Sequence, residues 1–173
     1  MLTFKQKVLF TNDECIGILD SYSKIKPTGN QIENGISYTY KDIDCENTFW
    51  ILERFINWIE SEVDCKIDWL ASEKRELYLQ TYIVGDEFRK HKDDVYNRQY
   101  TAGLLLNDSF EGGEFLVDTS KNFQSKFNNI VGNCYLFDSA LLHQLNPITN
   151  GERNIVLLFF KKSQIKYKKV QLI

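Results

Sequence analysis

The chain has 173 residues and a formal net charge of −3, and 43% of its residues are hydrophobic. This length suits one domain with a single core, for which twelve Phe, nine Tyr and three Trp supply apolar area. The composition therefore excludes a disordered chain, and the negative charge argues against binding to a phosphate backbone. We expect a single domain, residues 1–173, that binds no nucleic acid.

The hydropathy pattern gives an expectation for location. Residues 1–12 contain no continuous apolar stretch and no small-residue cleavage site, so no secretory signal is predicted. Apolar runs stay well short of the roughly 20 residues that a membrane-spanning helix needs. We therefore expect a cytoplasmic protein with no membrane partner, and the sequence does not predict its oligomeric state.

The four cysteines indicate structural thiols. Cys15, Cys45, Cys65 and Cys134 lie far apart and form no CxxC pair. A zinc site or a disulfide framework would need closer or paired spacing, so we predict buried free thiols.

Two helices are predicted near the start of the chain. Thr11 and Glu14 have the spacing of a capping box, and apolar residues with a helical period follow them, which predicts a helix over residues 12–23. Residues 45–63 show the same one-sided period and predict a second helix. Between the two, apolar and polar residues alternate over residues 36–40, which favours a short strand.

From residue 69 onward the helical period disappears, and short runs of β-branched, aromatic and leucine residues are separated by Gly, Asn and Asp. Helices followed by many short strands predict an α+β, mainly β fold, such as a jelly roll or barrel with helices packed on one outer face. The helical part would span about residues 1–70 and the β-rich core about residues 71–165. The predicted strands are residues 77–84, 88–92, 100–106, 114–118, 133–137, 142–147 and 154–161.

The last segment, residues 161–169, carries five lysines in a polar setting. We expect a solvated terminal strand or tail, with a patch for an anionic partner as the alternative.

The only two histidines suggest a metal site. Residues i and i+2 of a strand face the same way, so His91 and Asp93 can present an imidazole and a carboxylate together. His143 comes from a later strand, which a closed or sandwich-like sheet can bring opposite that pair. Two imidazoles and one carboxylate leave three metal positions open, as in non-haem Fe(II) oxygenases. The spacing of His91 and Asp93 alone is a weak signal, and a structural role remains the alternative for His143.

Arg153 stands at the start of a strand whose residues 155–160 are apolar on both faces. Burying a guanidinium is costly unless a carboxylate meets its planar fork of donors. Glu152 faces the other side of the strand. We therefore infer a ligand carboxylate as the partner of Arg153, with a remote Asp or Glu as the alternative.

A longer series of residues carries an ordered pattern: Tyr82, Gly85, Phe88, His91, Asp93, Arg98, Thr101, Leu105, Leu106, Asn107, Gly112, Gly113, Glu114, Phe115, Gly132, Phe137, His143, Pro147, Gly151 and Arg153. The pattern covers residues 82–160 and resembles the prolyl 4-hydroxylase branch of the 2-oxoglutarate and Fe(II)-dependent dioxygenases. The resemblance implies a double-stranded β-helix, or jelly roll, with N-terminal helices packed on one face.

The resemblance also assigns roles. His91, Asp93 and His143 would hold Fe(II), and Arg153 would pair with the distal carboxylate of 2-oxoglutarate. Iron, 2-oxoglutarate and O2 would be required, with ascorbate as an optional further cofactor.

Three further positions keep alternatives open. Tyr82 would hydrogen-bond the co-substrate or serve as a core aromatic, and Arg98 would contact substrate at the entrance or form a structural ion pair. Leu105 stands where some oxygen-sensing prolyl hydroxylases place a tyrosine on the co-substrate. A second phenolic contact is therefore absent or supplied elsewhere. The candidates for an apolar wall that excludes water are Phe88, Leu104, Leu106 and Phe137, with ordinary core packing as the alternative for each.

The implied activity is that of a 2-oxoglutarate-dependent dioxygenase, which hydroxylates an unactivated C–H bond while 2-oxoglutarate splits to succinate and CO2. The first hypothesis for the substrate is a prolyl or other residue of a peptide or protein, and the second is a free amino acid or small metabolite. Relatives that dealkylate nucleic acids carry a second arginine where this chain has Phe159. A non-catalytic jelly-roll binding protein is the third hypothesis, from a different class.

Overall fold

The two stretches of helical period form two helices. In the computed structural model, α1 spans Asn12–Ser23 and α2 spans Phe49–Glu62. The Thr11 hydroxyl accepts a hydrogen bond from the Glu14 backbone N–H, and the Glu14 carboxylate accepts one from the Thr11 N–H, which confirms the predicted capping box. Neither helix is long and apolar enough to cross a membrane. The structure describes residues 2–33, 36–43, 48–72 and 75–168, so the predicted helix start at residue 45 lies outside it.

Strands make up most of the remaining described chain. Each predicted strand has an observed counterpart, but the sequence missed several short ones in which alternation is weak or polar residues dominate. The strands are β1 (Lys5–Val8), β2 (Gly29–Glu33), β3 (Ile36–Asp42), β4 (Cys65–Ile67), β5 (Glu76–Tyr82), β6 (Phe88–His91), β7 (Arg98–Leu105), β8 (Phe110–Gly112), β9 (Phe115–Ser120), β10 (Phe123–Lys126), β11 (Asn133–Asp138), β12 (His143–Leu145), β13 (Ile148–Gly151), β14 (Arg153–Lys161) and β15 (Ile165–Tyr167).

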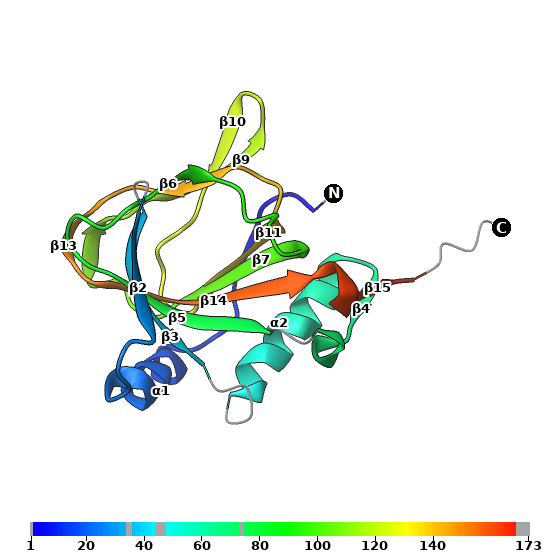
Figure 1. Cartoon of the computed structure of the whole chain (residues 1–173), viewed down its shortest axis with the longest axis horizontal. Helices are drawn as coiled ribbons and strands as arrows, with labels where there is room; N and C mark the ends of the chain where they lie inside the picture. The colour runs from blue at the N-terminus through cyan, green and yellow to red at the C-terminus, as the bar shows by residue number, and fades with distance from the viewer. Residues whose placement is uncertain (1, 34–35, 44–47, 73–74, 169–173) are drawn as a thin grey trace.

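Ten strands follow one another in the main antiparallel sheet, in the order β1-β11-β7-β14-β5-β3-β6-β12-β9-β10, and β2 pairs with β3. The sheet bends, so that β6 and β9 lie across from β7, β14 and β5 (Figure 1). Its two ends approach each other, because the Gln6 side chain of β1 donates to the Lys126 carbonyl of β10 and accepts from the Asn128 N–H. The described fold is therefore mainly β, with two helices and antiparallel sheets.

Strand β14 separates two apolar clusters, as its sequence predicted. Val156, Leu158 and Phe160 belong to the cluster that includes the buried faces of α1 and α2. Ile155, Leu157 and Phe159 belong to a second cluster, which β9 and β11 complete. The helices thus cover one face of the β7–β14–β5 layer (Figure 1), and the other face points into the bend of the sheet.

The described cysteines are the buried free thiols that we expected. Cys15, Cys65 and Cys134 are buried and form no disulfide. Burial raises the pKa of Cys15 to about 11, so that thiol stays protonated at neutral pH. Cys45 lies outside the described residues.

The lysine-rich segment is not a tail at its start. Lys161 is the last residue of β14 and is buried, with its ammonium 3.7 Å from the Glu76 carboxylate. Farther on, β15 pairs with β4, and the exposed Lys166 and Lys168 form ion pairs with acidic side chains of that region. Lys169 lies outside the described residues. The prediction of a solvated terminal strand or tail was wrong for Lys161, because its side chain is buried beside Glu76.

Candidate active site

The two histidines lie side by side on neighbouring strands. Strand β12 pairs directly with β6, and His143 is the register partner of His91. The centroids of the two imidazole rings are 4.2 Å apart. The structure brings His143 to the His91 and Asp93 pair, as expected, and it does so because β12 is the sheet neighbour of β6.

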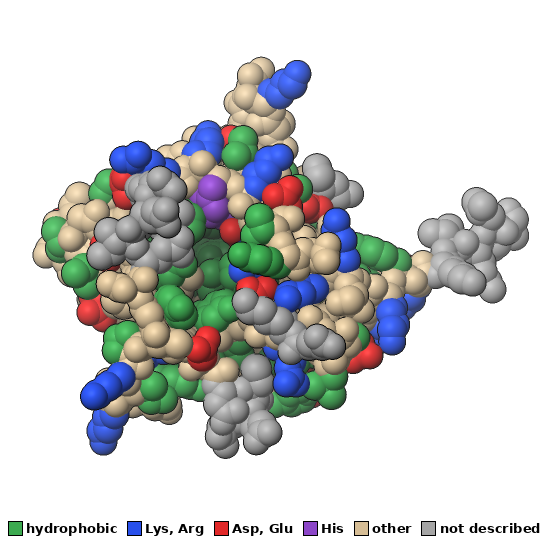
Figure 2. Space-filling view, viewed as in Figure 1, with side chains coloured by type: hydrophobic (Ala, Val, Ile, Leu, Met, Phe, Trp, Pro, Cys, Tyr) green, Lys and Arg blue, Asp and Glu red, His purple; other side chains and the backbone are tan. Residues whose placement is uncertain are grey.

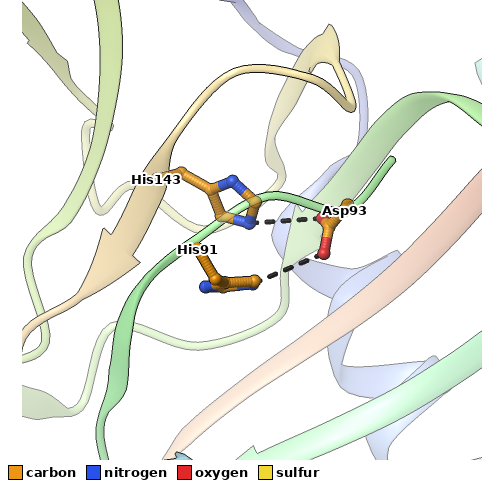
Figure 3. Close-up of side chains that lie close together, drawn as sticks. All are labelled: His91, Asp93 and His143. Carbon is orange, nitrogen blue, oxygen red and sulfur yellow. Dashed lines mark ion pairs between the residues drawn. The ribbon is translucent and has the colours of Figure 1, made fainter. Parts of the chain in front are cut away.

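Asp93 completes the group just after β6 ends. Its backbone N–H donates to the Ser139 carbonyl at 2.9 Å, which turns the carboxylate toward both rings. One carboxylate oxygen lies 3.4 Å from Nε2 of His91, and the other lies 3.2 Å from Nε2 of His143 (Figure 3). One nitrogen from each ring and one carboxylate oxygen all lie within 4.8 Å of one another. This set has the donor chemistry of a two-His, one-carboxylate metal centre.

The outer nitrogens of both rings are held by backbone carbonyls. Nδ1 of His91 donates to the Arg89 carbonyl at 2.7 Å, and Nδ1 of His143 donates to the Leu141 carbonyl at 3.0 Å. A carbonyl oxygen only accepts, so each Nδ1 carries a hydrogen, and Nε2 is the ring atom that is left to bind a metal. Both rings therefore present a metal-binding nitrogen toward Asp93.

A buried hydroxyl holds the Asp93 carboxylate, and a second buried hydroxyl contacts the first. The Thr101 hydroxyl of β7 donates to the carboxylate at 2.9 Å, and it also lies 3.0 Å from the Ser139 hydroxyl. Burial alone would raise the pKa of Asp93, but His143 and His91 hold it well below its usual range. The carboxylate is thus ionised and held in one orientation. The Ser139 contact was not predicted, because it links loop and strand residues that are distant in sequence.

A cavity of about 490 Å³ opens next to the three residues. Figure 2 shows the hollow from outside, with hydrophobic side chains in its depth and a histidine at its rim. The aromatic side chains that line it come from strands on both sides of the bend: Tyr38, Tyr40, Tyr78, Tyr82, Phe88, Phe115, Tyr135 and Phe159, with Tyr96 at the loop before β7.

Of the four candidates for the apolar wall, Phe88 lines the cavity, and the other three belong to the packed core. The Phe137 ring packs 4.8 Å from the His143 ring. Leu104 and Leu106 belong instead to the cluster under the helices. Leu105 lies between them on β7 and belongs to the cluster on the cavity side. Alternation along the sequence gave the period of β7 but not which of its faces meets the cavity.

Arg153 lies at the inner end of the cavity as the first residue of β14, opposite Tyr82 in the register with β5. It is only 2% exposed, and within the described residues its Nε and Nη2 have no hydrogen-bond partner. Burial lowers its pKa, yet a guanidinium stays protonated in proteins. Glu152 faces away, as expected, and accepts a hydrogen bond from Asn154. A buried cation with two free donors fits a carboxylate ligand.

Tyr82 shares the cavity face of β5 with Tyr78 and Gln80, as the alternation predicted. Its ring centroid lies 5.7 Å from the Arg153 guanidinium carbon. Its hydroxyl donates to the Gln80 side-chain carbonyl at 2.9 Å, so the hydrogen of this phenol is already used by the protein.

Arg98 lines the cavity near its outer end and forms an ion pair with a buried carboxylate. Its Nε and Nη2 donate to Glu76 at 3.1 and 2.6 Å, and its guanidinium lies 3.5 Å from the Phe159 ring centroid. The alternative of a structural ion pair is therefore observed, in a position that also faces the cavity.

Comparison with known proteins places this geometry in a family. Residues 77–161 match the family model of the 2OG-Fe(II) oxygenase superfamily. This segment is a 2OG-Fe(II) oxygenase domain. The resemblance inferred from the ordered residues is thereby confirmed, and the family implies Fe(II) and 2-oxoglutarate at a site such as the His91, Asp93 and His143 group.

Curated relatives of the oxygenase domain are PKHD-type hydroxylases. The chain is 31% identical over 85 residues to the PKHD-type hydroxylase of Prochlorococcus marinus. The aligned segment covers 46% of this chain and 37% of that protein. It is 28% identical over 82 residues to the PKHD-type hydroxylase of Shewanella oneidensis, and the aligned segment covers 46% of this chain and 36% of that protein. The match thus spans little more than a third of the length of these relatives.

Solved structures of prolyl hydroxylases share the fold over nearly the whole chain. The Pseudomonas putida prolyl-4-hydroxylase superposes with a TM-score of 0.72 at 17% identity, covering 94% of each chain. A prolyl hydroxylase from Trichoplax adhaerens, solved with a peptide fragment of hypoxia inducible factor, gives 0.74 at 18% identity, covering 95% of this chain and 86% of that one. At these identities the likeness establishes the fold.

Proposed function

We propose that this protein is a 2-oxoglutarate-dependent dioxygenase that hydroxylates an unactivated C–H bond. His91, Asp93 and His143 would bind Fe(II), and Arg153 would bind the distal carboxylate of 2-oxoglutarate. The observation that carries the proposal is Arg153, a buried cation in the same cavity as the three metal-ligand candidates, with two nitrogens that find no partner in the described part of the chain. A metal site alone is compatible with many chemistries, whereas a carboxylate anchor beside it is specific to an acidic co-substrate.

The proposed architecture is one double-stranded β-helix domain, with a helical part of about residues 1–70 and a core of about residues 71–165. The antiparallel strand order and the Gln6 contacts that join the two ends of the sheet support it.

When bound, Fe(II) with 2-oxoglutarate supplies the oxidising chemistry: O2 is consumed, 2-oxoglutarate becomes succinate and CO2, and one oxygen atom enters the substrate C–H bond. The protein's part is to bind and orient. Asp93 offsets metal charge, Arg153 sets the direction of the co-substrate, and the aromatic lining keeps water from the reaction.

A prolyl or other peptidyl residue is the proposed target. The outer end of the cavity, where Arg98 lies, is flanked by Val95 and Tyr96, which are 49% and 68% exposed and so available to a chain running across the surface. Arg98 would contact the substrate there. The alternative, a free amino acid or small metabolite, is compatible with the volume of the cavity.

Two measurements test the function. Anaerobic addition of Fe(II) and 2-oxoglutarate is expected to give the weak visible charge-transfer band of the chelate, and admission of air is expected to give succinate. Mass spectrometry of candidate peptides and amino acids, for a gain of one oxygen, then separates the two substrate classes. Absence of both the band and succinate with wild-type protein would show that the assignment is wrong.

The Thr101 hydroxyl provides a prediction for the metal site. Thr101→Val keeps the shape of the side chain and removes the hydrogen bond to Asp93, so Fe(II) or Mn(II) affinity should fall about 10- to 100-fold, the usual effect of removing a group that orients a ligand. Thr101→Ser restores the hydroxyl and should bind metal nearly as wild type does. Equal affinities for the Val and Ser variants, measured by equilibrium dialysis, would contradict this role.

A further inference from the structure

The carboxylate site at Arg153 contains a second buried phenol. We propose that the Tyr135 hydroxyl donates a hydrogen bond to the same co-substrate carboxylate that Arg153 binds, and that Gly103 provides the space for it. The inference rests on the proposed function and adds one binding group to its site.

The placement of the ring follows from the pairing of β11 with β7. Tyr135 is the register partner of Gly103, and a Cβ built on Gly103 would lie 2.3 Å from Cζ and 2.6 Å from the hydroxyl oxygen of Tyr135. The ring therefore lies across β7 at Gly103, and Tyr135 and Arg153 both line the same cavity. Any side chain at position 103 would displace it.

The neighbours of Tyr135 hold the ring in this orientation. It stacks on Phe115 at 4.6 Å and meets Phe127 edge-on at 5.2 Å between centroids. The residue is only 3% exposed and still lines the cavity. A ring packed in this way loses little entropy on binding a ligand, because its position is set in advance.

The Tyr135 hydroxyl has a hydrogen to donate. Within the described residues no protein group forms a hydrogen bond with it, whereas the Tyr82 hydroxyl already donates to Gln80. Because Tyr135 lines the cavity, its hydroxyl can meet a ligand acceptor there. Tyr135 thus offers a phenolic donor in addition to Tyr82, whose role stays open between a co-substrate contact and a core aromatic.

The charges around the hydroxyl agree with its place. Burial raises the pKa of Tyr135, Arg153 opposes the rise, and Asp93 adds to it. The phenol thus remains a neutral donor, and it interacts electrostatically with both Arg153 and Asp93. Position 105 on the neighbouring strand holds a leucine and offers no phenol, so Tyr135 supplies from β11 what that position lacks.

The test compares two ligands on Tyr135→Phe with Mn(II) bound. 2-Oxoglutarate affinity, measured by calorimetry without O2, should fall about 10- to 100-fold, as expected for losing one hydrogen bond to a charged group. 2-Oxopentanoate has the same chelating end and no distal carboxylate, so its affinity should not change. Tyr82→Phe is the matched control and should weaken 2-oxoglutarate less, because its hydroxyl serves Gln80.

Each other outcome overturns a defined claim. Unchanged 2-oxoglutarate affinity in Tyr135→Phe, or an equal loss for both ligands, removes Tyr135 from the carboxylate site and leaves the proposed function standing. Wild-type protein that binds Mn(II) without binding 2-oxoglutarate overturns the proposed function, and this inference with it.

Discussion

Replacing His143 with alanine is expected to abolish both the visible charge-transfer band with Fe(II) and 2-oxoglutarate and the formation of succinate. His143 presents one of the two ring nitrogens at the site, and the chain has no third histidine to replace it. Removing a group that only orients a ligand costs about 10- to 100-fold in metal affinity, so losing a ligand should cost more than about 100-fold. Equilibrium dialysis with Mn(II) measures the loss directly.

Gln144→Ala is the matched control for this variant. Gln144 follows His143 on β12, and its side chain donates to Asn146 instead of turning to Asp93. The control should keep the band, the succinate yield and the metal affinity, and the two variants should have similar circular dichroism spectra. If His143→Ala kept both the band and succinate, His143 would not be a metal ligand.

Local structural features that depend on a few neighbouring residues were predictable from the sequence. The capping box of α1 needs only Thr11 and Glu14, and the two buried faces of β14 follow from six consecutive apolar residues. His91 and Asp93 also fall on one side of the chain because they are two positions apart. Arg153 could be singled out because a cation at the start of a buried strand needs a partner, whatever the rest of the fold is.

Features that depend on strand pairing were not predictable. His143 lies beside His91 because β12 joins β6, and neither strand contains a signal for that partner or that register. The same limit left Leu104 and Leu106 open between the cavity wall and the core, since alternation gives the period of β7 but not which side meets the helices. Tyr135 stood within a predicted strand, but its relation to Gly103 exists only once β11 and β7 pair.

Arg153→Leu is expected to change co-substrate binding and protein stability in opposite directions. Truncating one partner of a buried charge pair costs about 2–5 kcal/mol of binding, or roughly 30- to 4,000-fold in 2-oxoglutarate affinity. Metal affinity should be unchanged, because the metal-ligand candidates are His91, Asp93 and His143. Arg153→Lys keeps the charge but not the planar fork of donors, so its affinity should fall between those of the wild type and the leucine variant.

Without 2-oxoglutarate, Arg153→Leu should be more stable than the wild type. The wild-type protein then holds a buried cation with two unpaired nitrogens, and leaving such groups unsatisfied costs about 1–3 kcal/mol. Leucine removes that cost, so the melting temperature of the metal-loaded variant should rise while the further rise on adding 2-oxoglutarate disappears. A variant that is less stable in the absence of 2-oxoglutarate, or that is still stabilised by it, would show that Arg153 has a structural partner and is not the carboxylate anchor. A higher melting temperature without 2-oxoglutarate, together with a lower affinity for 2-oxoglutarate, would identify Arg153 as a residue that serves binding and lowers stability.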